Sequence, residues 1–309
     1  MTTPAAPEGS VPDRSESDRS GSDRSGSVLE VACRAAGFTA RGAEPVRLAE
    51  NEIWRLPGRV IVRIVRPGQG AAAAREVRVA RWLAEQGVPA VRPLPVAQPV
   101  AALGHPVTFW EELPPHRRGT TADVVDLLKR LHALPLPDWE LGRLDPFVRV
   151  PERIAAATTT PADDRAWLHR RYEELRARWA ALPAGLPHCV VHGDAWLGNV
   201  VLTPDPVLID FERACVGPPE WDLVATAAKI GTVGTVTSAE YADFCTSYGT
   251  DVTAWAGYEL MSAVRELRMV SYAVRYAVGR PGWHADAQQR VDSLRGRRGP
   301  RPWNWRTIL

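Results

Sequence analysis

Lysine is almost absent from this chain of 309 residues, which has two lysines among its 38 basic residues. The other basic residues are arginines scattered along the chain without a recognition motif for DNA or RNA, so we expect no nucleic-acid partner. Long apolar runs are also lacking: nowhere do 18 apolar residues follow one another, and we expect no membrane contact. The first residues lack the apolar core of a signal peptide, which predicts a cytoplasmic protein.

Cysteine is scarce as well. The four cysteines are widely spaced and form no C-x-x-C pair, which predicts free thiols in a reducing cytosol. The net charge of +2 and the hydrophobic content of 45% are ordinary values for a soluble globular protein. The length is sufficient for a sizeable core in one or two domains, and nothing in the composition indicates an oligomeric state.

Residues 1–27 differ in composition from the rest of the chain. Asp-Arg-Ser repeats every five residues, beginning at Asp13, Asp18 and Asp23, within a background of serine, glycine and proline. Such a segment has almost nothing to bury, so we expect a disordered tail over 1–27. An inert extension and a docking or phosphorylation segment are the two interpretations.

What the chain does contain is a compact set of oxygen-bearing side chains. An H-G-D-x-x-x-x-N pattern runs from His192 to Asn199 with its acid at Asp194, and an I-D-F-E pattern places a second acid at Asp210. Phosphoryl transfer from a nucleotide requires a carboxylate to orient the attacking hydroxyl and two oxygen ligands to hold Mg²⁺ on the phosphates. The spacing therefore predicts phosphoryl transfer.

The local sequence supports this interpretation. Short β-branched runs at 190–191, 200–202 and 207–209 predict strands, and a Thr-Pro-Asp-Pro turn joins the last two into a hairpin. Asn199 and Asp210 then lie at neighbouring strand ends, where one Mg²⁺ can bridge them. Mg²⁺ is commonly held by one or two protein ligands together with substrate phosphates, which fits this small set.

The segment 190–223 resembles the catalytic core of the aminoglycoside phosphotransferase-like (phosphotransferase enzyme) family, a branch of the protein-kinase-like fold. In that family the two motifs precede a G-x-x-x-x-D-L helix start, found here at 217–223. The resemblance, weaker over about 45–305, implies an α+β bilobal fold. Its small N-terminal nucleotide-binding lobe, an antiparallel sheet plus a helix, is expected at 28–112. A larger, mainly helical catalytic and substrate-binding lobe is expected at 113–309.

The resemblance also implies roles for single residues. Asp194 corresponds to the catalytic carboxylate, and Asn199 and Asp210 correspond to the Mg²⁺ ligands. His192 and Asp222 correspond to residues that support the loop from behind. By residue type alone, Asp194 and Asn199 are also common turn formers, and Asp222 suits the first turn of a helix that follows two prolines.

The expected nucleotide-binding residues lie in the N-terminal half. A strand is predicted over 59–65 and a helix over 71–86. Kinase-like folds pair a strand lysine with a helix glutamate to hold phosphates, but no lysine precedes residue 129. Arg63 with Glu76 is the best substitute because a guanidinium binds phosphate bidentately; a solvated strand arginine is the alternative. No glycine-rich loop precedes the strand, so Asn51 and nearby backbone amides are the expected phosphate contacts.

Two further features complete the expected lobes. Residues 109–113 fall where the family joins its two lobes, and the resemblance implies that the backbone of Glu111 and Leu113 holds the purine; an ordinary loop fits equally. After the junction, helices are predicted at the ranges 120–134, 154–182 and 258–278. In the resembling family, helices of this lobe form the walls of the acceptor pocket.

The leading hypothesis is a small-molecule kinase, an ATP-dependent phosphotransferase with an alcohol group as acceptor. It would transfer the γ-phosphoryl of ATP, or GTP, to a hydroxyl of a small metabolite or antibiotic, with Mg²⁺ as cofactor. A protein kinase is disfavoured because four residues between Glu212 and Gly217 leave no room for an activation segment. A non-catalytic nucleotide-binding or regulatory protein is the other alternative. Residues 213–309 hold nine acidic and twelve basic residues, which argues against a strongly cationic acceptor.

Overall fold

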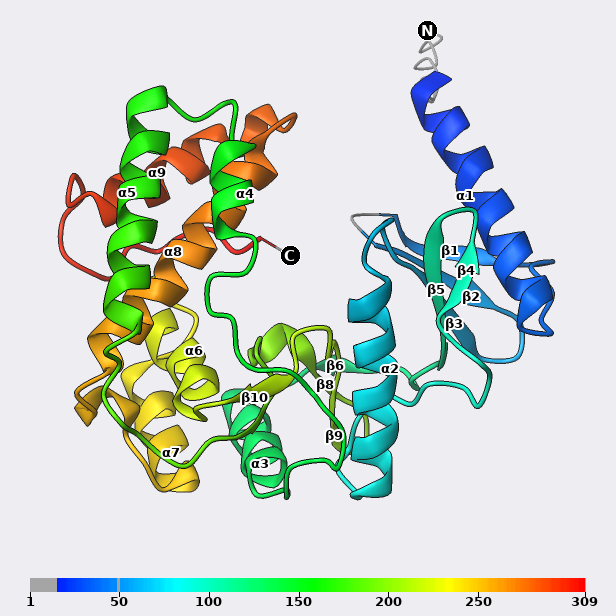
Figure 1. Cartoon of the computed structure of the whole chain (residues 1–309), viewed down its shortest axis with the longest axis horizontal. Helices are drawn as coiled ribbons and strands as arrows, with labels where there is room; N and C mark the ends of the chain where they lie inside the picture. Colours follow the sequence, from blue (N-terminus) through cyan, green and yellow to red (C-terminus); the bar gives the residue numbers. More distant parts are fainter. Residues whose placement is uncertain (1–15, 49–50, 309) are drawn as a thin grey trace, which may run out of the picture. The chain divides into compact units, whose positions relative to one another are not determined.

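The chain forms two compact units in the computed structural model, which describes residues 16–48 and 51–308 (Figure 1). Of the described residues, the first unit comprises those up to Ala74 together with Pro93–Glu112, and the second comprises Arg75–Arg92 and those from Leu113 onwards. The chain leaves the first unit for the last time after Glu112. Residues 75–92, which we assigned to the N-terminal lobe, instead group with the second unit.

The first unit is built on an antiparallel sheet of five strands in the spatial order β1-β2-β3-β5-β4. The strands are β1 (Glu44–Leu48), β2 (Glu52–Leu56), β3 (Val60–Ile64), β4 (Val100–Ala102) and β5 (His105–Glu111). The strand predicted over 59–65 is confirmed as β3. Its alternate residues Val60, Val62 and Ile64 are buried, whereas Arg63 lies on the opposite face and is partly exposed.

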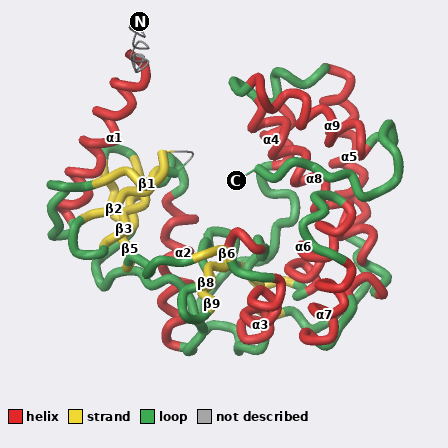
Figure 2. Tube along the Cα trace, turned by 180° about the vertical axis from the view of Figure 1, so that it is seen from behind, coloured by secondary structure: helices red, strands yellow, loops and turns green. Residues whose placement is uncertain are grey.

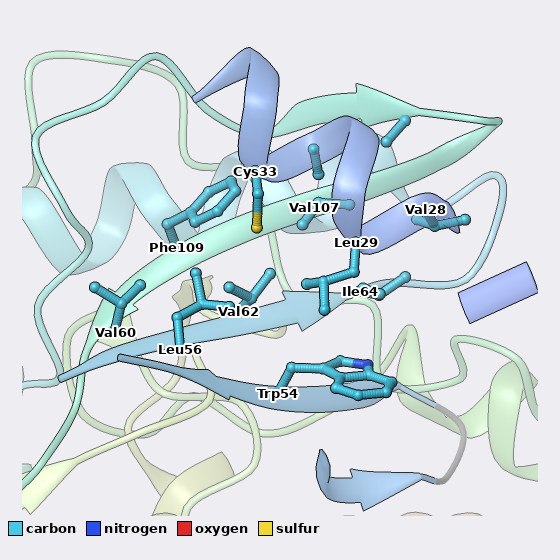
Figure 3. Packing of buried hydrophobic residues seen from close by; sticks show 12 residues of the cluster. Val28, Leu29, Cys33, Trp54, Leu56, Val60, Val62, Ile64, Val107 and Phe109 are labelled. Carbon is cyan, nitrogen blue, oxygen red and sulfur yellow. The ribbon is translucent and has the colours of Figure 1, made fainter. Parts of the chain in front are cut away.

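Helix α1 (Glu16–Ala35) covers one face of this sheet (Figure 3). Val28, Leu29 and Cys33 project from the helix into a core that includes Val62 and Phe109 of the sheet. The structure differs from the expected tail over residues 16–27, which continue this helix toward the N-terminus. Once a helix is anchored by packing, each added residue gains a backbone hydrogen bond without a new nucleation cost. Residues 1–15 lie outside the described residues.

The second unit is mainly helical, as Figure 2 shows. Its two small antiparallel sheets pair β7 (Cys189–Val191) with β10 (Cys215–Gly217), and β8 (Val200–Leu202) with β6 (Arg117–Arg118) and β9 (Pro206–Leu208). The hairpin predicted over 200–209 is therefore confirmed. The helices are α3 (Thr121–His132), α4 (Val150–Ala155), α5 (Ala162–Trp179), α6 (Glu220–Gly231), α7 (Ser238–Tyr248), α8 (Tyr258–Ala277) and α9 (His284–Leu294). Helix α2 (Gly70–Glu85) begins in the first unit and continues into the second.

One predicted helix is divided in two. We expected a single helix over 154–182, but α4 ends at Ala155 and α5 begins at Ala162. Pro161 explains the break, because its ring disfavours helical geometry at the residue before it. The helices expected near 71–86, 120–134 and 258–278 are confirmed as α2, α3 and α8.

The free thiols expected from the sequence are confirmed in the structure. All four cysteines are free thiols, and three of them are buried. Within residues 16–48 and 51–308, no helix has both the length and the apolar content needed to cross a membrane.

The packing of α3 gives the first testable prediction. Leu128 is fully buried against its neighbours, whereas Leu136, just beyond the helix, is 53% exposed. We expect Leu128→Ala to lower the free energy of unfolding by about 2–5 kcal/mol, because it removes buried methyl groups and leaves a cavity. The matched Leu136→Ala should change it by less than about 0.5 kcal/mol. Urea unfolding followed by tryptophan fluorescence measures both, and equal losses would contradict this account of the core.

Candidate active site

The predicted site residues of the C-terminal half gather around the loop that joins β7 to β8. Asn199 ends this loop in a short 3₁₀ turn, and the Ile209 N–H donates to its carbonyl oxygen at 3.0 Å, which places Asp210 at the adjacent strand end. The Asn199 side-chain amide donates to the carbonyl oxygen of Asp194 at 2.9 Å. The loop and the hairpin thus bring Asp194, Asn199 and Asp210 into one site.

Backbone geometry at this loop demands particular residues. Gly193 has a φ of +82°, and a Cβ there would lie 2.3 Å from the carbonyl oxygen of Arg213. A Cβ on Gly198 would meet the Trp196 ring at 2.3 Å, so this glycine lets the indole fold against the loop. Asp210 has a φ of +67°, a left-handed conformation that aspartate tolerates better than most residues.

His192 connects the two halves of the site through its ring. Its Nε2 lies 3.0 Å from the Ile209 carbonyl oxygen, and its Nδ1 lies 3.4 Å from the Asp194 backbone nitrogen. A carbonyl oxygen only accepts, so Nε2 carries the hydrogen and Nδ1 accepts from the Asp194 N–H. Both ring nitrogens are therefore engaged, and the buried imidazole holds the loop beside the end of β9.

Asp222, in the first turn of α6, lies directly behind the loop. This fully buried carboxylate accepts from the His192 N–H at 2.6 Å and from the Gly193 N–H at 3.0 Å. The His132 Nε2, at the end of α3, lies 3.2 Å from the same group. Burial alone raises the pKa of Asp222, but the hydrogen bond and charge of His132, with the nearby Arg265, outweigh it and hold the pKa below its ordinary value.

Contacts of Trp221 and Arg265 hold the first turn of α6 in place. The Trp221 indole N–H donates to the Gly193 carbonyl oxygen at 2.9 Å. The Arg265 guanidinium, from α8, lies 3.9 Å from the Trp221 ring centroid and donates to the Trp221 carbonyl oxygen. Arg265 also approaches Asp222 at 3.9 Å, so α8 supplies the positive charge that compensates the buried carboxylate.

Two further cations lie near Asp194. The Nζ of Lys229, on α6, lies 4.3 Å from the centroid of the Trp196 ring in the loop. The Arg268 guanidinium, on α8, lies 5.4 Å from the Trp221 ring centroid and donates to the Pro146 carbonyl oxygen at 3.0 Å. Burial lowers the pKa of Lys229 to about 7, against the opposing effect of Asp194. Burial likewise lowers the pKa of Arg268 to about 9.

The predicted nucleotide-binding residues divide between the two units. Asn51, Arg63 and Glu111 belong to the first unit, whereas Glu76 and Leu113 belong to the second. Glu76 is buried on α2, Arg63 is partly exposed on β3, and Glu111 ends β5. Asn51 directly precedes β2, and its two preceding residues lie outside the described residues. The pairing of Arg63 with Glu76 stays a prediction.

The donor set suits a hard divalent cation held partly by substrate. Asn199 uses its amide nitrogen within the protein, which leaves its Oδ1 as an oxygen donor in addition to the Asp210 carboxylate. In the part of the chain that the structure describes, no three His, Cys, Asp or Glu side chains cluster at metal-binding distance. One amide and one carboxylate oxygen fit Mg²⁺, which keeps several ligands from water and phosphate, better than zinc.

The sequence did not single out several of these residues. Trp196, Lys229, His132, Arg265 and Arg268 carry no motif of their own. The last three lie 60 or more positions from the loop along the chain and reach it through Asp222 or Trp221. The available signal for Lys229 was its rarity, because it is one of two lysines in the chain.

The buried carboxylate generates a stability prediction. We expect Asp222→Asn to lower the free energy of unfolding at neutral pH by about 3–5 kcal/mol, because an amide leaves the charges of its partners uncompensated. The folded pKa of Asp222 is depressed, so its contribution is complete above the unfolded value of 3.8 and is lost as pH falls through the folded pKa. The difference between wild type and variant should therefore narrow below pH 3.8. Urea titrations at several pH values measure it, with the exposed Asp205→Asn as control, and a pH-independent gap would refute the prediction.

The Lys229 environment generates a second prediction. With ¹³Cε-labelled lysine, the chain has two lysine signals, and Lys229→Met assigns them. The Lys229 signal should titrate near pH 7. Because the Asp194 carboxylate raises this pKa, Asp194→Asn should lower the titration midpoint further. A midpoint near the ordinary value of 10.5, or one that Asp194→Asn leaves in place, would contradict the proximity described above.

Several solved structures described as kinases or phosphotransferases superpose on this chain. A choline/ethanolamine kinase family protein from Mesorhizobium loti superposes with a TM-score of 0.60 at 18% identity, covering 89% of this chain and 94% of that one. An amicoumacin kinase superposes with a TM-score of 0.61 at 15% identity, again covering 89% of this chain and 94% of that one. An aminoglycoside phosphotransferase from Streptomyces rimosus gives 0.55 at 23% identity, covering 77% of this chain and 96% of that one. These similarities establish the bilobal protein-kinase-like fold.

Sequence comparison identifies the family. No curated protein matches the chain. The model of the phosphotransferase enzyme family matches residues 43–261, which is well over half of the chain and includes both motifs of the site. This chain therefore belongs to the phosphotransferase enzyme family and is a phosphotransferase with a protein-kinase-like fold.

Proposed function

We propose that this phosphotransferase is a small-molecule kinase that transfers the γ-phosphoryl group of ATP, or GTP, to a hydroxyl of a small acceptor. The observation that carries the proposal is the joining of Asp194, Asn199 and Asp210 in one site by the loop and hairpin contacts. These are the oxygen-bearing groups that the chemistry requires, in the family to which the chain belongs.

Asp194 is the proposed catalytic carboxylate. Its backbone is held on both sides, since its N–H donates to His192 and its carbonyl oxygen accepts from Asn199. Its partly exposed carboxylate makes no hydrogen bond to any residue in the described ranges, so it is available to an incoming hydroxyl. From this position it would orient the acceptor oxygen toward the γ-phosphorus and accept the hydroxyl proton.

Asn199 and Asp210 are the proposed ligands of Mg²⁺. When bound, the ion would neutralise charge on the nucleotide phosphates. The chain itself would hold the two side-chain oxygens in a fixed relation, because the Ile209 N–H ties the end of β9 to the Asn199 carbonyl oxygen. The amicoumacin kinase structure is a complex with AMP-PNP and Ca²⁺, which supports a nucleotide and a divalent cation in this fold.

The nucleotide contacts are the least conventional part of the proposal. Arg63, oriented by Glu76, would take the place of the lysine that kinases use for the α and β phosphates. Asn51 would contact phosphate, and the backbone of Glu111 and Leu113 would hold the purine. The ADP in the streptomycin complex of the Streptomyces rimosus enzyme supports nucleotide binding by this fold.

A small acceptor fits the structure better than a protein substrate. Strand β10 begins at Cys215, two residues after Arg213, so the chain has no room for an activation segment between Asp210 and α6. The structural neighbours include kinases of choline, amicoumacin and aminoglycosides, which also supports a small hydroxylated acceptor. A non-catalytic role is disfavoured, because Asp194, Asn199 and Asp210 are all present.

Replacing the proposed carboxylate tests this function. With purified protein, Mg²⁺ and ATP or GTP, we expect acceptor-dependent release of nucleoside diphosphate in a screen of hydroxylated metabolites and antibiotics. Asp194→Asn should lower that rate by about 10²–10⁴-fold while nucleotide binding by equilibrium dialysis persists. Asp205→Asn, in the exposed turn of the hairpin, is the matched control and should retain activity. An Asp194→Asn variant with normal turnover would overturn the assignment.

A further inference from the structure

The backbone that leads into Asp210 is held by main-chain hydrogen bonds. Leu208, the last residue of β9, donates to the Pro89 carbonyl oxygen at 3.0 Å and accepts from the Val91 N–H at 2.9 Å. These bonds join extended segments through backbone atoms, so they require no particular side chain. The position of the chain just before Asp210 is therefore fixed by the fold itself.

The backbone that follows Asp210 is held differently, by a side chain. After the left-handed conformation of Asp210, the chain forms a turn in which the Ala214 N–H donates to the Phe211 carbonyl oxygen at 3.0 Å. The carbonyl oxygen of Glu212, inside this turn, accepts from the Nη1 of Arg75 on α2 at 3.2 Å. Both partners belong to the second unit, although they are 137 positions apart along the chain.

Arg75 differs from the next arginine on the same helix. Its side chain is partly buried, and among the described residues it forms no ion pair with a carboxylate. A partly buried guanidinium without a carboxylate partner needs another acceptor, and here that acceptor is the carbonyl oxygen in the turn. Arg78, three positions along α2, is exposed, and its guanidinium lies 4.1 Å from the centroid of the Trp139 ring. The contact with the turn is thus particular to Arg75.

This contact acts on the residue that precedes the turn. A non-glycine residue at a φ of +67° keeps that conformation only when its surroundings enforce it. The Glu212 carbonyl is two residues beyond Asp210, so fixing its direction limits the rotations of the intervening backbone. A charged donor makes this hydrogen bond stronger than a neutral donor would.

We propose that Arg75 is a positioning residue for the Mg²⁺ site, and that its hydrogen bond to the Glu212 carbonyl oxygen keeps the Asp210 carboxylate directed at the ion. This inference rests on the proposed role of Asp210 as a ligand. Arg75 would contribute to the binding of the metal-nucleotide complex and not to the binding of nucleotide without metal. A shorter cationic donor at position 75 should preserve part of this contribution, and an apolar side chain of similar length should not.

Nucleotide binding with and without metal tests the proposal without turnover. Equilibrium dialysis of AMP-PNP against the full-length chain, in Mg²⁺ and in EDTA, gives the factor by which Mg²⁺ tightens binding. Arg75→Met should reduce this factor about tenfold, since a hydrogen bond from a charged donor is lost, and leave the affinity in EDTA unchanged. Arg75→Lys should reduce the factor less, and the matched control Arg78→Met should keep it.

Two results would overturn the role of Arg75. One is a Mg²⁺ factor in Arg75→Met equal to that of the wild type. The other is an equal loss of affinity in Mg²⁺ and in EDTA, which would make Arg75 a direct nucleotide contact or a general support of the fold. If the methionine variant does not fold, Arg75→Gln, which keeps a shorter neutral donor, carries the same comparison.

A second variant separates this inference from the proposed function. Asp210→Asn should abolish the tightening of AMP-PNP binding by Mg²⁺, because it removes a charged ligand of the ion. If Asp210→Asn leaves the tightening intact, the proposed metal site itself fails. If Asp210→Asn abolishes it but Arg75→Met does not change it, the metal site stands and the positioning role of Arg75 is refuted.

Discussion

The buried carboxylate of Asp222 is the constraint on which the rest of the site depends. It accepts hydrogen bonds from the backbone N–H groups of His192 and Gly193. Without these bonds the two N–H groups would be buried without partners, so the carboxylate fixes the position of the loop. A buried charge is tolerated only when compensated, and compensation here comes from His132 on α3 and Arg265 on α8. The site is therefore held by helices that meet at one carboxylate.

A chain of hydrogen bonds runs from the buried Asp222 to the proposed reacting groups. The loop backbone, once fixed by Asp222, places the His192 ring so that it links Asp194 to the end of β9. The Asn199 side chain then donates a hydrogen bond to the Asp194 carbonyl oxygen. The Asn199 carbonyl oxygen accepts from the N–H of Ile209, the residue that directly precedes Asp210. Each proposed chemical group is thus one or two hydrogen bonds from a buried partner, which is the kind of preorganisation that phosphoryl transfer needs.

Local sequence patterns were sufficient where neighbouring residues determine the structure. The hairpin 200–209, strand β3 and helices α2, α3 and α8 follow from β-branched runs, turn residues and apolar periodicity, and the motifs identified the family. Contacts distant in sequence were not accessible: nothing near His132 or Arg265 indicates that it reaches Asp222. The division of α4 from α5 was missed although Pro161 marks it, because the flanking stretches are both helical. The assignment of residues 75–92 to the second unit likewise depends on packing that no local pattern encodes.

One basic residue beside the Asp194 loop is a lysine, and this choice has a chemical consequence for the site. In a chain where arginine supplies nearly all of the positive charge, the residue over the Trp196 ring is a lysine. Its ammonium is a compact point charge whose pKa falls readily on burial, here to about 7, whereas a guanidinium stays charged. The charge over the Trp196 ring therefore changes near neutral pH, which an arginine at the same position would not do.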